Sequence, residues 1–144
     1  MTTIPFEDWF QAQQLMTCYA HNIETGDGVG LGDCFTDDVH LDLSEILPDR
    51  RPAKGRAAAV EMIENRRSSS PRLGQVRRHL FSNFLIHEYT PARITSQLSV
   101  KYTVTPIEGS PYIFFTGQYN DTLHKDSHGR WRIASRRLRI DRAE

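Results

Sequence analysis

The sequence predicts an α+β fold in which three helices precede a long antiparallel sheet. Apolar residues recur at helical spacing in three segments before residue 68. After residue 75, four long segments rich in β-branched and aromatic residues are separated by turn residues, as strands are. Helices grouped before strands are typical of α+β proteins. The length of 144 residues fits one domain, spanning residues 1–144.

The first helix is expected to run from Pro5, which suits a first helical turn, to the glycine-containing residues 25–28. Its apolar stripe is formed by Phe6, Trp9, Phe10, Gln13, Met16, Tyr19, Ala20 and Ile23. Glu24 follows in the last turn, close to this stripe. Its carboxylate is therefore expected to be either solvated at the helix end or partly buried with a raised pKa.

Two shorter helices are expected after the first, one over residues 29–35 and one over residues 55–67. Ala58, Met62 and Ile63 give the later of these helices its inner side. Between the two helices, residues 39–43 alternate like a half-buried strand. Residues 44–54 carry two prolines and mixed charges, which predicts a loop.

Four strands are expected at residues 75–88, 92–105, 112–124 and 130–141. Because side chains alternate between the faces of a strand, one face of the first is expected to carry Arg77, His79, Phe81, Asn83 and Leu85. The opposite face is also apolar, and the helices cannot cover both. An uncovered apolar face of this kind marks an interface, so we expect a homodimer or a higher homo-oligomer.

Composition argues against several classes of protein. The formal net charge of zero does not favour a nucleic-acid partner. No segment approaches about 18 consecutive apolar residues and none resembles a signal peptide, so the protein is expected to be cytoplasmic with no membrane partner. Cys18 and Cys34 are not spaced as metal ligands, and no glycine loop follows a strand to hold phosphate. No metal and no cofactor are therefore expected.

His79 is the residue that the sequence favours most for chemistry, because it is titratable and lies in a strand with apolar neighbours. Two interpretations stay open, a packing residue and a general base. With Glu24 it would form a couple in which the carboxylate orients the imidazole and raises its basicity. The sequence alone does not show that the two side chains meet.

Six segments carry a resemblance to a known family: residues 19–27, 35–42, 55–57, 78–83, 117–121 and 129–137. In this order and spacing they resemble the nuclear transport factor 2-like superfamily, and within it the SnoaL-like branch that includes scytalone dehydratase and the lindane dehydrochlorinase. The resemblance covers nearly the whole chain. It implies a cone-shaped fold, in which three N-terminal helices pack against a strongly curved antiparallel sheet.

The resemblance also implies roles for single residues. The general base and its partner Asp in those enzymes fall on His79 and Glu24, with Glu one methylene longer than Asp. An Arg five residues after the last-strand Trp, which helps to hold the leaving group in the dehydrochlorinase, falls on Arg136. Three further groups of scytalone dehydratase, a Tyr, a His and a Ser, fall on Ile23, Val104 and Gln118. A scytalone-specific activity is therefore not expected.

The implied function is a cofactor-independent, dehydratase-like lyase or isomerase acting on a small, largely apolar cyclic or aromatic substrate. His79 and Glu24 would supply acid/base catalysis, and a tyrosine or Arg136 would stabilise a negative oxygen. The pocket between helices and sheet is expected to be lined by Trp9, Met16, Tyr19, Phe81, Asn83, Tyr102, Phe115 and Tyr119.

The small subunit of ring-hydroxylating dioxygenases provides the alternative. Its strand motif is similar to residues 77–83, and its later motifs are similar to residues 117–121 and 131–132. That subunit is mainly structural. On this interpretation His79 does no chemistry, and the chain is a non-catalytic subunit or a domain that binds a small molecule.

Overall fold

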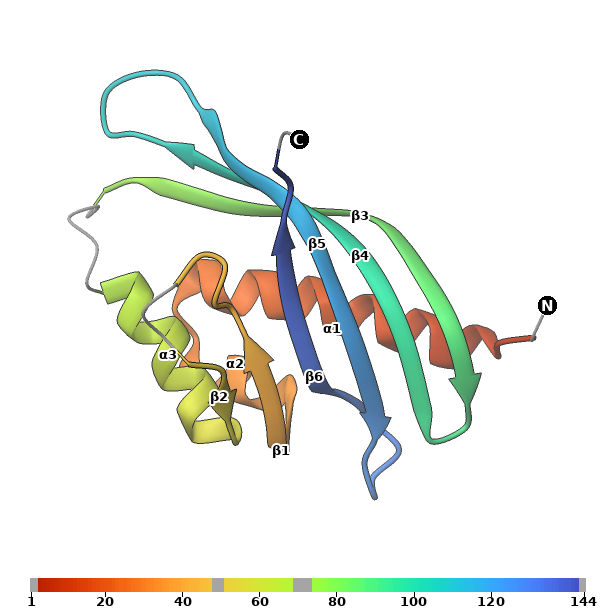
Figure 1. The fold of residues 1–144 in the computed structure, drawn as a ribbon. Helices are drawn as coiled ribbons and strands as arrows, with labels where there is room; N and C mark the ends of the chain where they lie inside the picture. The colour runs from red at the N-terminus through yellow and green to blue at the C-terminus, as the bar shows by residue number, and fades with distance from the viewer. Residues whose placement is uncertain (1–2, 48–50, 69–73, 143–144) are drawn as a thin grey trace.

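The computed structural model describes residues 3–47, 51–68 and 74–142. Three helices pack against one side of a curved, unclosed sheet of six strands (Figure 1). The predicted α+β class is confirmed. None of the described helices is both long and apolar enough to cross a membrane. The elements are α1 (Phe6–Thr25), α2 (Gly28–Asp33), β1 (Phe35–Asp42), β2 (Ala53–Lys54), α3 (Arg56–Ser68), β3 (Val76–Thr90), β4 (Arg93–Thr105), β5 (Tyr112–Lys125) and β6 (Trp131–Ile140).

The sheet has the strand order β2-β1-β6-β5-β4-β3. The four long strands are antiparallel neighbours in chain order, whereas β1 pairs in parallel with β6. This pairing explains why β1 starts at Phe35, earlier than the predicted start at residue 39. Phe35 pairs with Ile133, and the Ile133 N–H donates to the Cys34 carbonyl at 2.7 Å, so α2 ends at Asp33. The short strand β2 lies inside the predicted loop and pairs with β1.

In the N-terminal half of α1, the face that packs against the core is not the predicted apolar stripe. Phe6, Trp9 and Phe10 are exposed, while Asp8 is buried. The Asp8 carboxylate accepts hydrogen bonds from the Trp131 indole at 2.9 Å and from the Tyr89 hydroxyl at 2.5 Å, and it pairs with Lys125 at 2.8 Å. Burial acts to raise the pKa of Asp8, but these partners outweigh it and lower the pKa. The partners come from distant strands, so helical periodicity could not reveal them.

A β-bulge in β3 changes which side chains face the helices. Before it, Arg77, His79 and Phe81 are the half-buried residues, as alternation predicts. Asn83 has a positive φ of 54°, and the register with β4 shifts between Ser82 and Leu85. A bulge adds one residue to a strand, so Phe84 and Ile86 become inner positions, and a second register shift between Ile86 and Glu88 makes Tyr89 the next one. The predicted inner places of Asn83 and Leu85 are therefore wrong, and both are exposed.

The outer face of the sheet keeps exposed apolar side chains where β3 and β5 begin. Val76, Leu80 and Ile113 are each about half exposed, at 46%, 52% and 55%. The sheet register places the starts of both strands beside the end of β4. The helices lie on the other side of the sheet (Figure 1) and do not cover this face.

Candidate functional site

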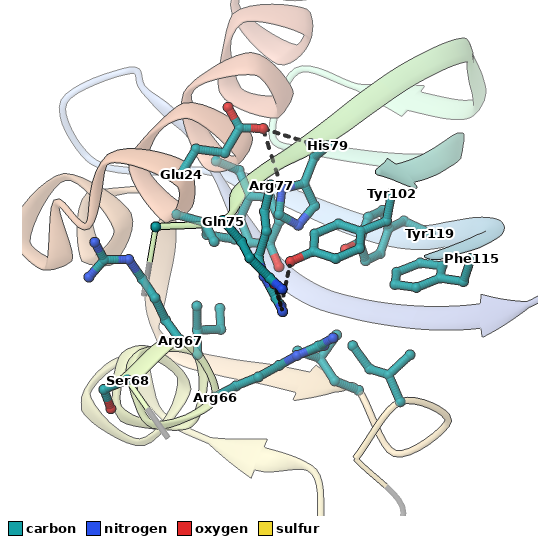
Figure 2. Close-up of a pocket in the computed structure, with 16 residues that line it drawn as sticks. Glu24, Arg66, Arg67, Ser68, Gln75, Arg77, His79, Tyr102, Phe115 and Tyr119 are labelled. Atoms are coloured by element: carbon teal, nitrogen blue, oxygen red, sulfur yellow. Dashed lines mark hydrogen bonds and ion pairs between the residues drawn. The ribbon is translucent and has the colours of Figure 1, made fainter. Parts of the chain in front are cut away.

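A cavity of about 450 Å³ lies between the end of α1, α3 and the inner face of the sheet (Figure 2). Aromatic rings from β4 and β5 form one side, and polar side chains from α3 and the start of β3 form another. The described lining residues are Tyr19, Ile23, Glu24, Leu43, Ile46, Ile63, Arg66, Arg67, Ser68, Gly74, Gln75, Arg77, His79, Tyr102, Phe115 and Tyr119.

Six of the residues predicted for the site line this cavity, namely Glu24, His79, Tyr19, Tyr102, Phe115 and Tyr119. The others lie outside its lining. Trp9 is on the exposed side of α1, and Asn83 points outward from the bulge. Phe81 packs behind the site, with ring centroids 6.1 Å from His79 and 5.8 Å from Tyr119. Met16 is buried, and its sulfur contacts the Arg136 guanidinium.

The C-terminus of α1 places Glu24 against β3. Gly26 ends the helix in the left-handed conformation, with φ of 73°, and the Asp27 N–H donates back to the Asn22 carbonyl at 2.9 Å. The positive φ is what favours glycine at this position, since residues with a Cβ rarely adopt it. The sharp end of the helix leaves Glu24 in the last turn, directed at the strand.

Glu24 makes two contacts with His79. Its Oε1 accepts a hydrogen bond from the His79 backbone N–H at 2.6 Å and lies 3.6 Å from the ring nitrogen Nδ1. The second distance exceeds the range of an N–H···O hydrogen bond, about 2.7–3.2 Å, so this contact is an ion pair when the ring is protonated. Both side chains are largely buried, with 13% of Glu24 and 9% of His79 exposed. Figure 2 shows the imidazole between Glu24 and Tyr102.

The pKa of Glu24 is lowered from its ordinary value. Burial by itself raises this pKa, but hydrogen bonds and charge attraction from His79, together with Arg78, outweigh it. The Arg78 guanidinium lies 3.3 Å from the second carboxylate oxygen, Oε2. Glu24 is therefore partly buried, as one of the two alternatives predicted, but the expected rise of its pKa is wrong. The carboxylate is a stable anion that holds both the backbone and the side chain of His79.

Glu24→Gln should lower the free energy of unfolding by about 1–3 kcal/mol at pH 7, since it removes hydrogen bonds made to a charged group. A carboxylate with a lowered pKa stabilises the fold above its ordinary pKa of 4.5 and loses that contribution as the pH falls through the folded value. The difference between wild type and variant should therefore shrink below about pH 4.5. Urea unfolding at pH 7, 5, 4 and 3 measures it, and a difference that stays constant would contradict the assignment.

Arg136 does not reach the cavity. Its side chain is completely buried and donates two hydrogen bonds to the Asp121 carboxylate, at 2.8 and 2.7 Å. The guanidinium is sandwiched between the rings of Tyr19 and Tyr119, with centroid distances of 4.3 and 4.2 Å. The expectation that Arg136 contacts a leaving group is therefore corrected. It lies beneath two tyrosines that do line the cavity.

Sequence reasoning missed the basic side of the cavity. Arg66 and Arg67 come from the last turn of α3, and Arg77 comes from the same face of β3 as His79. Strand alternation had already placed Arg77 beside His79, which was a usable signal. Nothing in the sequence indicated that the end of α3 and the start of β3 would line the same cavity.

Comparison with known proteins shows the family. A SnoaL-like domain matches residues 6–137, which is nearly the whole chain. The chain belongs to the SnoaL-like domain family. The predicted membership of the nuclear transport factor 2-like superfamily is confirmed. No significant sequence match was found among curated proteins.

Several solved structures are similar to this SnoaL-like chain. Rv3472, a protein of unknown function from Mycobacterium tuberculosis, is 30% identical with a TM-score of 0.77, over 96% of this chain and 79% of that one. A protein from Catenulispora acidiphila, solved in complex with S-DNPA, is 24% identical with a TM-score of 0.80, over 95% and 96%. A scytalone dehydratase-like protein from Novosphingobium aromaticivorans is 20% identical with a TM-score of 0.76, over 94% and 85%.

Proposed function

We propose that this SnoaL-like chain is a cofactor-independent lyase or isomerase of the dehydratase-like kind, acting on a small, largely apolar cyclic or aromatic substrate. The observation that carries the proposal is the Glu24–His79 pair at the wall of a cavity faced by Tyr102, Phe115 and Tyr119. A ring of the substrate would lie against these aromatic side chains. The relatives support small-molecule binding or a dehydratase-like fold.

His79 would act as the general base that takes a proton from carbon. Glu24 lies on the Nδ1 side of the imidazole, which leaves Nε2 as the nitrogen that would meet the substrate. Taking up a proton makes the ring an imidazolium, and the nearby carboxylate stabilises that charge. The hydrogen bond from the His79 backbone to the same carboxylate oxygen fixes the strand relative to α1. Glu24 would thus be a positioning residue.

Tyr19 and Tyr119 would stabilise the negative oxygen that forms when the proton leaves. Both tyrosines line the cavity. Burial raises the pKa of Tyr19 above its ordinary value and raises the pKa of Tyr119 well above it, so both keep their protons at neutral pH. A protonated phenol donates a hydrogen bond to a developing oxyanion. Arg136, stacked between the two rings, would hold them in place.

The proposal is tested by deuterium exchange into β-tetralone, a bicyclic ketone whose carbon next to the carbonyl gives up a proton to a base. His79 would remove this proton to give the enolate, and a deuteron from solvent would replace it. Exchange measured by NMR in D₂O should be faster with the protein than without it. No acceleration with this or related cyclic ketones, together with co-purification of a large catalytic subunit from the native host, would favour the structural-subunit alternative.

We also propose that the protein self-associates through the outer sheet face that carries Val76, Leu80 and Ile113. These side chains are large, apolar and about half exposed, as at many interfaces. Light scattering at micromolar concentration should give at least twice the mass of one chain, and Leu80→Glu should shift the protein toward a monomer. A wild-type monomer under these conditions would contradict the proposal.

A further inference from the structure

We propose that Tyr102 is the acid that protonates a leaving hydroxyl group of the substrate, and that Arg77 positions the Tyr102 hydroxyl for this step. The inference rests on the proposed function, because it takes His79 as the base and the cavity as the site of a cyclic substrate. It adds a second catalytic residue and the reaction that this residue implies, which is the elimination of water from a cyclic β-hydroxy ketone.

The pairing of β3 with β4 brings Tyr102 to the proposed base. His79 lies directly opposite Tyr102 in the sheet register, and Arg77, two residues before His79, lies on the same face of β3. The ring centroid of Tyr102 is 4.7 Å from that of His79, and the Phe115 ring stacks on Tyr102 at 5.2 Å. Tyr102 lines the cavity and is only 6% exposed, so its ring is held on both sides.

The contact with Arg77 decides in which direction the Tyr102 hydroxyl can donate. The Arg77 guanidinium donates a hydrogen bond to the Tyr102 oxygen at 3.1 Å. A guanidinium group carries only donors, so the tyrosine oxygen is the acceptor in this contact and the tyrosine proton is not used in it. Figure 2 shows the hydroxyl at the end of the ring that points away from Phe115 and toward Arg77. The proton of Tyr102 can therefore be donated to an oxygen atom of a ligand in the cavity.

A base and an acid side by side can remove water from a β-hydroxy ketone, whose acidic C–H and hydroxyl group are on adjacent carbons. His79 takes the proton from the carbon beside the carbonyl, and the electron pair of that C–H bond forms the C=C bond. The C–O bond breaks, its electron pair stays on oxygen, and the Tyr102 proton converts the leaving hydroxide to water. The Tyr102 phenolate then takes the proton from the His79 imidazolium. Both residues are restored, and no other reactant is consumed.

Arg77 would be a positioning residue in this step. Tyr102 is negatively charged once it has given up its proton, and its hydrogen bond with Arg77 then joins two charged groups, which makes the bond stronger. The guanidinium thus favours the proton transfer without contacting the substrate. This role depends only on the hydrogen bond to Tyr102. Other contacts of Arg77 do not oppose it, because a guanidinium group has several N–H donors.

The test compares three compounds that share one bicyclic ring. 4-Hydroxy-β-tetralone loses water, and 4-acetoxy-β-tetralone loses acetate, which leaves without being protonated. Both eliminations remove a proton from C3 and give β-naphthol, which is measured by its absorbance. β-Tetralone itself has no leaving group and reports only proton exchange at C3. Tyr102→Phe should slow the loss of water about 10²–10⁴-fold more than the loss of acetate or the exchange, because that is the usual contribution of a general acid.

Two further variants test the role of Arg77 and control for the change of tyrosine. Arg77→Gln should also slow the loss of water more than the loss of acetate, by about tenfold or more, since it removes a hydrogen bond to a charged group. A merely structural role of Arg77 would slow both eliminations alike. Tyr112→Phe is the matched control, because Tyr112 is 49% exposed and lies outside the described cavity lining. It should leave all three rates unchanged.

The outcomes separate this inference from the proposed function. If Tyr102→Phe slows all three reactions equally, or none of them, Tyr102 is not the acid for the leaving group. If the wild type does not accelerate proton exchange, the result counts against the proposed function itself. The wild type also decides the question if Tyr102→Phe does not fold. Its acceleration over the uncatalysed reaction should be larger for the loss of water than for the loss of acetate, and equal accelerations would overturn the inference.

Discussion

Replacing Arg136 with methionine is expected to lower the free energy of unfolding by about 3–5 kcal/mol. The guanidinium and the Asp121 carboxylate are both completely buried and joined by two hydrogen bonds. Removing one partner leaves the other charge buried without compensation, and this is the strongly destabilising way to break such a pair. Urea unfolding at pH 7 measures the loss.

Arg137→Met is the matched control for Arg136→Met. Arg137 is the next residue of β6, but its side chain is 55% exposed and its ion pair with Asp42 spans 3.6 Å. Exposed pairs contribute about 0–1 kcal/mol, so the control should change stability little. The double variant Arg136→Met/Asp121→Leu should recover part of the lost stability, because it no longer buries a lone charge. An Arg136→Met protein that is fully stable but inactive would instead restore a direct catalytic role.

His79→Gln is expected to slow the catalysed exchange of β-tetralone protons by about 10²–10⁴-fold, the usual contribution of a general base. The amide keeps polarity and approximate size but cannot take up a proton at neutral pH. The backbone hydrogen bond from residue 79 to Glu24 does not depend on the side chain. Stability should therefore change by no more than about 1 kcal/mol, which separates a catalytic from a packing role.

His87→Gln provides the control on the same strand. His87 is an exposed residue of β3 and lies outside the cavity lining, so its replacement should affect neither exchange nor stability. If His79→Gln keeps the wild-type exchange rate, His79 is not the base. If the His79→Gln protein loses several kcal/mol of stability as well as activity, His79 is a packing residue, as the structural-subunit alternative requires.

Much of the fold follows from local patterns. The helix over 6–25 and the four long strands were predicted to within a few residues, because long periodic segments and glycine-containing turns determine them locally. The errors occur where contacts with segments distant in the sequence determine the structure. Asp8 is buried because Trp131, Tyr89 and Lys125 supply partners, against the apolar stripe of its own helix. Asn83 starts a bulge, and simple alternation fails beyond it.

The candidate site was predictable in part for the same reason. Glu24 and His79 lie at a helix end and on a strand face that the sequence indicates, although their contact requires the packing of α1 on β3. The position of Arg136 depends on the register of β5 with β6, which pairs it with Asp121. The sequence of β6 by itself does not determine that register. The three arginines of the cavity likewise come together only because α3 and β3 both line it.

A crystal structure of the protein with β-tetralone tests the central claim most directly, because it shows where a ring compound binds relative to His79. We expect the ring against Tyr102 and Phe115, the ketone oxygen toward Tyr19 or Tyr119, and the acidic carbon about 3–3.5 Å from Nε2 of His79. A ligand bound instead in the groove beside Phe10 and Cys18, with the cavity around His79 left free of it, would contradict the account.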